Sequence, residues 1–207
     1  MCRILLTSNG FYTDEIKRQF MQLINGFILN KSASIITTAS REKHNNKFAI
    51  KAKEDLLSMG FSKADFIDIE FDSPDLLENN EVIYINGGNP YYLLYHLKKS
   101  GTDTLFKKMA KQDIVFVGVS AGAMILGQSI AVVDFFTPDM NSVGIKDLTA
   151  ACLTKKLIFP HYDREDLFPD RLGRTIENRL KNFENKNNCS VTRLKDDQSL
   201  IVSNGSY

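Results

Sequence analysis

Residues 118–122, GVSAG, fit the pattern G-x-S-x-G, which places a serine nucleophile on a sharp turn between a strand and a helix. The apolar run IVFV precedes the pattern, and AMILG, which is compatible with a helix, follows it. Gly118 and Gly122 leave room for the chain to fold back, so the Ser120 hydroxyl projects above the sheet. The Ala121 N–H at the helix start can then face a developing oxyanion. The spacing predicts a nucleophile elbow; the plainer alternative is a glycine-rich turn whose serine only caps a helix.

Three histidines are candidates for the general base that such a serine requires. His44 lies in the polar stretch REKHNNK, where we expect it to be solvated, and His96 lies in an amphipathic helix, where packing is the expected role. His161 follows the apolar run LIF and Pro160, at the mouth of an expected strand. A histidine in that place can reach a nucleophile above the sheet, so we assign the base to His161; a structural histidine at a strand end is the alternative.

A third member, an acid, must orient the imidazole. Asp196 and Asp197 lie in a late turn, and Asp139 lies earlier, in the segment TPDM. Aspartates are common in turns for conformational reasons alone. The spacing does not choose among these three carboxylates.

A second loop, residues 86–90 with the sequence NGGNP, directly follows an apolar strand. Its two glycines allow the backbone to approach a ligand closely. If this loop lies beside the elbow, the Gly88 N–H is the second oxyanion donor. Taken alone, the loop also reads as an ordinary tight turn closed by Pro90, and it lacks the patterns of a phosphate-binding loop.

Short apolar runs alternate with longer amphipathic segments through most of the chain, which predicts a parallel sheet with helices on both faces. Ligands of such sheets bind beyond the carboxyl ends of the strands, where the loops after residues 85 and 117 begin. We expect strands at residues 3–7, 34–38, 66–71, 81–85 and 114–117, and helices at residues 13–29, 46–59 and 91–99.

The pattern is weaker after residue 128. Residues 129–133 and 157–159 resemble strands, and residues 170–185 resemble a helix that carries Arg171 and Arg174. Residues 190–194 and 200–203 are expected to form a closing hairpin around the turn KDDQ.

Composition sets bounds on the class of protein. The chain has 207 residues, 43% hydrophobic and 25% charged, which is typical of one globular domain, so we expect a single domain over residues 1–207. A net charge of +1 provides no field for nucleic acid or an anionic membrane. Three cysteines, Cys2, Cys152 and Cys189, fit neither a disulfide framework nor a zinc site. Since no apolar stretch could span a membrane, we expect a cytoplasmic protein without membrane or nucleic-acid partners.

Three segments of the sequence resemble the family of dipeptidase E (α-aspartyl dipeptidase) and cyanophycinase, which are serine peptidases. They are INGGNPYYLLYHLKKSG, GVSAGAMILG and IFPHYDRED followed by DRLGRTIE. The family's elbow G-x-S-A-G-A is matched by residues 118–123, and its loop G-G-G-N-T is matched with departures at Asn86 and Pro90. The resemblance implies a flavodoxin-like fold (class I glutamine amidotransferase-like), an α/β mostly parallel sheet with helices on both faces in three layers.

The resemblance also implies roles for individual residues. The base histidine corresponds to His161 and the late acid to Asp196, where the family usually has the longer glutamate; Asp139, in an Asp-Met pair that dipeptidase E shares, is the alternate acid. An acidic P1 side chain would need a cation, because bidentate contact between arginine and carboxylate is strong and selective. The family's R-x-G-R pattern matches residues 171–174. The expected substrate-binding residues are Asn89, Arg171 and Arg174, and the expected oxyanion donors are Gly88 and Ala121.

The function implied is hydrolysis of a small peptide, at an aspartyl residue, through a Ser-His-acid triad and an acyl-enzyme. No cofactor or metal is expected, the partner is the small peptide substrate, and the chain is expected to be a monomer or a homodimer. Two alternatives stay open. One is an esterase or acyltransferase that uses the same elbow, and the other is a binding module that has lost turnover.

Overall fold

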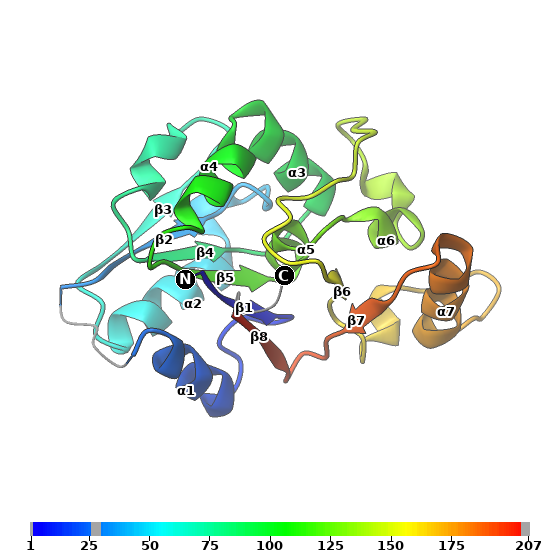
Figure 1. Ribbon diagram of the computed structural model, residues 1–207. Helices are drawn as coiled ribbons and strands as arrows, with labels where there is room; N and C mark the ends of the chain where they lie inside the picture. Colours follow the sequence, from blue (N-terminus) through cyan, green and yellow to red (C-terminus); the bar gives the residue numbers. More distant parts are fainter. Residues whose placement is uncertain (1, 26–29, 204–207) are drawn as a thin grey trace.

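The computed structural model describes residues 2–25 and 30–203. It has a six-stranded sheet, which lies at the centre of the fold (Figure 1). The strand order is β3-β2-β4-β5-β1-β8, and all neighbours pair in parallel except β1 and the edge strand β8. The five parallel strands are β1 Arg3–Thr7, β2 Ser32–Ile36, β3 Lys63–Ile67, β4 Val82–Ile85 and β5 Val115–Val119. These bounds confirm the predicted alternation, although β3 lies about three residues earlier than expected.

Helices cover both faces of this sheet, which makes three layers, as predicted. Alternate residues of one strand point to opposite faces: Val82 and Tyr84 of β4 join one buried cluster, whereas Ile83 and Ile85 join the other. The first cluster packs against α1 Asp14–Leu23 and α2 Lys47–Ser58. The second packs against α3 Pro90–Lys99, α4 Thr102–Met109 and α5 Ala121–Leu126.

Side-chain caps fix where several helices begin. Thr13 accepts a hydrogen bond from the Ile16 N–H at the start of α1, Asn46 does the same for α2, and Asn89 for α3. The helix predicted over residues 13–29 ends at Leu23, and positions 26–29 of that prediction lie outside the described residues. Helix α4 was not predicted, although its buried residues Thr102, Phe106 and Met109 have helical spacing.

The chain after α5 is less regular, and several predictions for it were wrong. A strand was predicted over residues 129–133, but the chain forms the short helix α6 Ala131–Asp134 there. Helix α7 Ile176–Asn187 begins after Thr175, which caps it, rather than at residue 170. The remaining strands are β6 Leu157–Phe159, β7 Val191–Arg193 and β8 Ser199–Ser203, and the short 3₁₀ turns are Lys43–Asn45, Pro74–Leu77, Pro138–Met140 and Glu165–Leu167.

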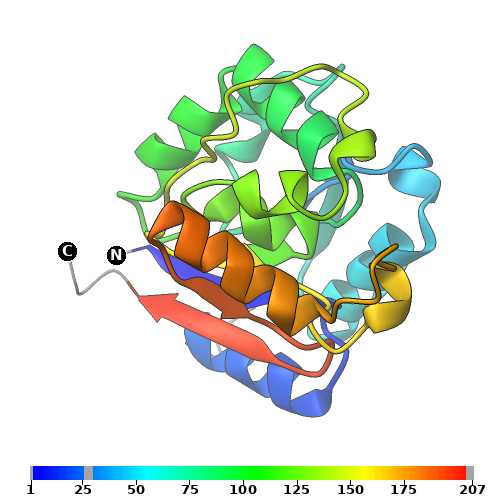
Figure 2. The same cartoon turned by 90° about the vertical axis from the view of Figure 1, so that its right-hand side faces the viewer.

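The predicted closing hairpin does not form. Strand β7 pairs in parallel with β6 in a separate two-stranded sheet, and β8 pairs antiparallel with β1 at the edge of the main sheet (Figure 2). The turn between β7 and β8 therefore connects two sheets. This turn contains Asp196, so the acid is placed where the two sheets meet.

Among the described residues, no helix is both long enough and apolar enough to cross a membrane. The three cysteines are free thiols, and burial raises the pKa of the Cys2 thiol to about 11.

Candidate active site

Ser120 occupies a strained turn between β5 and α5. Its backbone has φ 51° and ψ −113°, a region that non-glycine residues rarely adopt. Its N–H donates to the Thr7 carbonyl oxygen at 2.9 Å, which ties the turn to the end of β1. A Cβ on Gly122 would lie 2.1 Å from the Ile85 carbonyl oxygen, and a Cβ on Gly118 would lie 2.7 Å from the Gly122 carbonyl oxygen. The elbow therefore requires the small residues that its motif prescribes.

The loop after β4 lies directly against this elbow. A Cβ on Gly87 would lie 3.0 Å from the Cβ of Ser120. Gly88 has φ +145°, and a Cβ there would lie 2.2 Å from the Ala39 carbonyl oxygen. Within the described part of the chain, neither the Gly88 N–H nor the Ala121 N–H donates a hydrogen bond. Both N–H groups are thus free of a protein acceptor among the described residues, and their role as oxyanion donors stays a prediction.

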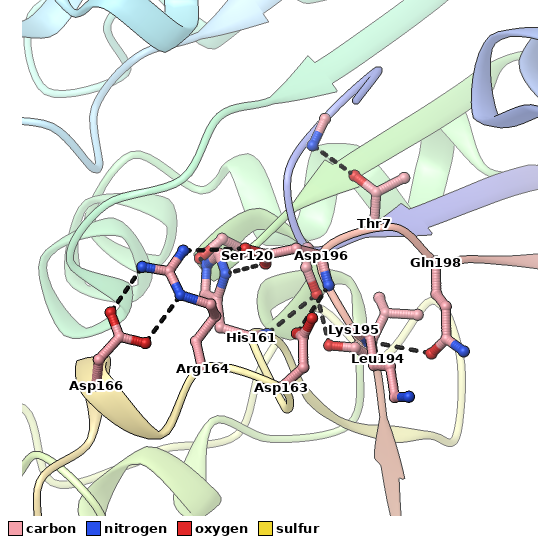
Figure 3. A network of polar contacts seen from close by, with 12 residues as sticks. Thr7, Ser120, His161, Asp163, Arg164, Asp166, Leu194, Lys195, Asp196 and Gln198 are labelled. Carbon is pink, nitrogen blue, oxygen red and sulfur yellow. Dashed lines mark hydrogen bonds and ion pairs between the residues drawn. The ribbon is translucent and has the colours of Figure 1, made fainter. Parts of the chain in front are cut away.

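His161 lies just after β6, and its ring reaches Ser120. Its Nε2 is 2.9 Å from the Ser120 Oγ, and its Nδ1 is 2.6 Å from an Asp196 carboxylate oxygen (Figure 3). The backbone of His161 has φ +56°, and its N–H donates to the Ser8 Oγ at 3.1 Å. The Ser8 hydroxyl donates in turn to the Leu194 carbonyl oxygen at 2.7 Å. One buried serine after β1 therefore links the histidine segment to the segment that carries the acid.

Asp196 is held from three sides. Its residue is 9% exposed, and besides His161 its carboxylate accepts from Arg164 Nη1 at 3.3 Å. Its own N–H donates to the Asp163 carboxylate at 3.0 Å. Arg164 also makes two hydrogen bonds to Asp166, at 2.9 and 2.7 Å, and its contacts with Asp166 and Asp196 raise the pKa of its guanidinium. These contacts hold the carboxyl group of Asp196 beside the imidazole and fix its direction.

Asp196 therefore reaches His161, although its side chain is shorter than the glutamate that the family usually has at this position. The connection from β7 to β8 brings the backbone of residue 196 close to residue 163, which shortens the span that a side chain must cover. Asp139 makes no hydrogen bond to His161; its neighbour Met140 accepts instead, through its carbonyl oxygen, from Asn89 Nδ2 at 2.8 Å. Of the candidate acids, only Asp196 contacts the ring within the described residues.

The predicted substrate-binding residues lie elsewhere. Arg174 forms a bidentate ion pair with Asp170, at 3.1 and 2.9 Å, and this pair lowers the pKa of the Asp170 carboxyl. Arg171 and Arg174 precede α7 instead of lying on it, and neither lines the cavity that contains Ser120. Asn89 uses its side chain to cap α3 and to hold the Met140 carbonyl oxygen. The structure gives no support to these three as substrate ligands.

A cavity of about 810 Å³ opens beside Ser120 and His161. Part of its wall is the loop after β1, which contains Phe11 and Tyr12. The other walls include residues of α1, α2 and β4, the loop after β4 and the segment after His161. The volume lies in the range of cavities that bind small molecules, so it is suited to a short peptide rather than a folded protein.

Sequence reasoning missed Ser8, Asp163 and Arg164. A signal existed for the last two, because an acid and a base stand two and three positions after the assigned histidine. Ser8 follows the carboxyl end of the first strand, which is the edge where ligands of parallel sheets bind. Its partners, however, are 153 and 186 residues away, and no local pattern indicates them.

No cluster of three or more histidine, cysteine or acidic side chains suited to a metal occurs in residues 2–25 and 30–203. The groups that do converge are a hydroxyl, an imidazole and a carboxylate. A hydroxyl whose proton can pass to an imidazole is equipped for acyl transfer.

A three-layer α/β fold that presents a serine on a strand-to-helix elbow defines a class, the serine hydrolases. The chain belongs to peptidase family S51, whose model matches residues 4–207, and this family membership makes it a serine peptidase. A curated relative, an uncharacterized peptidase from Pasteurella multocida, is 33% identical over 141 residues, which cover 66% of this chain and 68% of the relative.

Other relatives carry a more specific name. The chain is similar to peptidase E of Streptomyces coelicolor, with 28% identity over 126 residues that cover 61% of this chain and half (50%) of the relative. Among solved structures, a Listeria monocytogenes protein named for peptidase E superposes with a TM-score of 0.77 at 21% identity, covering 100% of this chain and 96% of that one. A peptidase from an acI-B1 Actinobacterium gives a TM-score of 0.67 at 15% identity, covering 100% and 85%. These two structures support the fold.

Proposed function

We propose that this chain hydrolyses short peptides through a triad of Ser120, His161 and Asp196. The observation that carries the proposal is the continuous line of hydrogen bonds from the Ser120 Oγ to His161 Nε2 at 2.9 Å and from His161 Nδ1 to Asp196 at 2.6 Å. Both distances are within the range of direct proton transfer between a nucleophile and its base. Membership of peptidase family S51 supports an amide as the bond that is cleaved.

The geometry suits a two-step reaction. Ser120 attacks the scissile carbonyl carbon while His161 accepts the hydroxyl proton, and the carboxylate of Asp196 stabilises the imidazolium. The N–H groups of Gly88 and Ala121 stabilise the oxyanion of the tetrahedral intermediate. His161 then gives its proton to the leaving amine, and a water molecule, activated by the same imidazole, hydrolyses the acyl-enzyme.

The finer proposal is that the bond cleaved adjoins an aspartyl residue. Its support is the resemblance to dipeptidase E, together with the relatives that carry the peptidase E name. A cavity of about 810 Å³ is consistent with a substrate of two or a few residues.

The test is hydrolysis of Asp-X, isoaspartyl, Asn-X and Ala-X dipeptides by the native chain and by Ser120→Ala. We expect cleavage of Asp-X that falls by about 10³-fold or more in Ser120→Ala, because the residual rate then depends on binding and the oxyanion donors alone. Ser62→Ala, which changes an exposed serine far from the elbow, is the matched control and should keep full activity. Undiminished cleavage by Ser120→Ala would refute the proposal.

A fluorophosphonate probe separates the two alternatives. A chain that reacts at Ser120 but cleaves only esters is an esterase or acyltransferase. A chain whose Ser120 stays unlabelled has an unactivated hydroxyl, since labelling requires the base, and it would be a binding module.

A further inference from the structure

The wall of the cavity that α1, α2 and β4 supply contains charged groups that the triad does not use. Lys17 comes from α1, Lys51 and Asp55 come from successive turns of α2, and Tyr84 comes from β4. All four line the same cavity as Ser120 and His161. A peptide bound at Ser120 and extending along the cavity would therefore meet this wall.

Asp55 forms ion pairs with both lysines. Its residue is 5% exposed, and one carboxylate oxygen lies 2.5 Å from Lys51 Nζ and 3.3 Å from Lys17 Nζ. Two ammonium groups therefore share one carboxylate, which leaves one positive charge in excess at this place. Each ammonium has three N–H donors and uses one on Asp55, so donors remain on the side facing the cavity.

Tyr84 adds a neutral donor that lacks a partner. Its residue is 2% exposed, it lines the cavity, and its hydroxyl makes no hydrogen bond among the described residues. Burial, with Asp55 nearby, raises the pKa of this hydroxyl, so it keeps its proton at neutral pH. A Cβ on Gly10 would lie 2.6 Å from the Tyr84 oxygen, so the loop after β1 packs closely against this side of the hydroxyl and a glycine is required there. The hydroxyl opens onto the cavity, so a ligand bound there can accept a hydrogen bond from it.

These groups select one kind of ligand. Two ammonium groups and a hydroxyl offer donors, whereas the single acceptor, Asp55, is already occupied by both lysines. A carboxylate accepts hydrogen bonds from all three and compensates the excess charge. An ammonium group of the substrate would have to displace a lysine from Asp55. Arg164, the other cation in the cavity wall, is already engaged by Asp166 and Asp196.

We infer that Lys17, Lys51 and Tyr84 form a subsite that binds a carboxylate of the peptide while Ser120 faces the scissile bond. The inference rests on the proposed function, and it gives the substrate anion a place that Arg171 and Arg174 do not provide. The carboxylate has two sources in a short peptide, an acidic side chain or the C-terminus. Both present the same chemistry to the subsite.

Binding to the Ser120→Ala variant tests the subsite without turnover. Calorimetry compares Ala-Ala with Ala-Ala-NH₂, which differ only in the terminal carboxylate, and Asp-Ala-NH₂ with Asn-Ala-NH₂, which differ only in the side-chain charge. We expect at least one acid to bind about tenfold more tightly than its amide, the size of one charge-assisted hydrogen bond. The pair that discriminates identifies the source of the carboxylate.

Lys17→Met and Lys51→Met, made singly in the same background, should each abolish most of that discrimination and leave binding of the amides unchanged. Single substitutions are used because each leaves Asp55 one ammonium partner, so the carboxylate is not buried alone. Tyr84→Phe removes only the hydroxyl and should weaken binding of the acid alone. Lys53→Met, on α2 but outside the cavity, is the matched control and should keep the discrimination.

The outcomes separate the subsite from the proposed function. Equal binding of acids and amides, or discrimination that survives in both lysine variants, overturns the subsite whether or not the native chain cleaves peptides. Lysine-dependent discrimination in a chain that cleaves no dipeptide supports the subsite and overturns the peptidase proposal instead.

Discussion

Ser120 and Gly88 follow strands at the centre of the main sheet, whereas His161 and Asp196 follow the three-residue strands β6 and β7 beside it. The first pair is positioned by packing: β4 and β5 are neighbours in the sheet, and the glycines at their ends contact backbone atoms of adjacent segments. The second pair is positioned by hydrogen bonds between distant segments. The His161 N–H donates to Ser8, the Ser8 hydroxyl donates to the Leu194 carbonyl oxygen, and the Asp196 N–H donates to Asp163. The chain thus holds the proposed nucleophile by packing and the proposed base by hydrogen bonds between distant segments.

This difference has a physical consequence. A packed elbow tolerates almost no added atom, since steric overlap at 2.1–2.2 Å forces the backbone to move. A loop held by hydrogen bonds tolerates changes in side-chain size but depends on each polar partner, since a lost hydrogen bond lets the loop shift. Substitutions in the two regions should therefore fail in different ways, and the three that follow test this from the largest expected effect to the smallest.

The largest effect is expected from Asp196→Asn, in the cross-linked region. The substitution keeps the shape of the side chain but removes the charge that stabilises the imidazolium and fixes its tautomer, so kcat should fall by about 10³–10⁴-fold with little change in KM. Steady-state kinetics on the peptide that the native chain cleaves measures this. Asp139→Asn is the control, and it should retain native kcat. A larger loss in Asp139→Asn than in Asp196→Asn would show that the other acid orients the base.

An intermediate effect is expected from Gly88→Ala, in the packed region. The new Cβ would overlap the Ala39 carbonyl oxygen, and φ +145° is strained for alanine, so the loop must move away from Ser120. We expect kcat to fall by about 10²–10³-fold through loss of an oxyanion donor, together with a lower free energy of unfolding. Activity and urea denaturation, measured on the same preparations, check both effects.

Gly101→Ala is the matched control for the backbone strain that Gly88→Ala introduces. Gly101 also has a positive φ, +76°, but a Cβ there has no atom within 4 Å. This variant should lose about 1 kcal/mol of stability and keep its activity. Equal kcat in the two variants would mean that the Gly88 N–H takes no part in the reaction.

The same contrast explains how far the sequence predicts the molecule. Strands β1 to β5 and helices α1 to α3 were predicted because each has an apolar run or a helical periodicity of its own, and the elbow has a motif that states its geometry. The loop at Gly88 was found because two glycines directly after a strand indicate a close approach of the backbone. Local sequence was sufficient wherever local packing determines the structure.

The cross-linked region was predicted less well for the converse reason. A three-residue strand such as β7 is too short for its periodicity to indicate which strand it pairs with. The prediction paired it with β8, the next strand in the chain, whereas in the structure it pairs with β6. The side-chain partners that place Asp196 are more than thirty residues away in sequence. Arg171 and Arg174 were assigned to substrate binding from a sequence motif. In the structure Arg174 pairs instead with Asp170, which lies within the same short segment.

The smallest effect is expected from Ser8→Ala, which removes the cross-link itself. Ser8 is 1% exposed; without its hydroxyl the His161 N–H loses its acceptor, whereas the Leu194 carbonyl oxygen still accepts from the Tyr162 N–H at 3.2 Å. The histidine backbone, already at a positive φ, is then free to relax away from Ser120. We expect kcat and the rate of fluorophosphonate labelling to fall by about tenfold with KM unchanged, because misplacement of the base affects the transition state more than binding.

Ser34→Ala separates this positioning role from a loss of stability. Ser34 is as deeply buried as Ser8 but lies on β2, away from the triad. If Ser8→Ala lowers only the free energy of unfolding, as Ser34→Ala can, and leaves kcat at the native value, then the packing of β6 and β7 alone holds the base. A fall in kcat in Ser8→Ala alone would instead mean that the serine after the first strand acts through His161, and that the base depends on the cross-link as the nucleophile depends on its glycines.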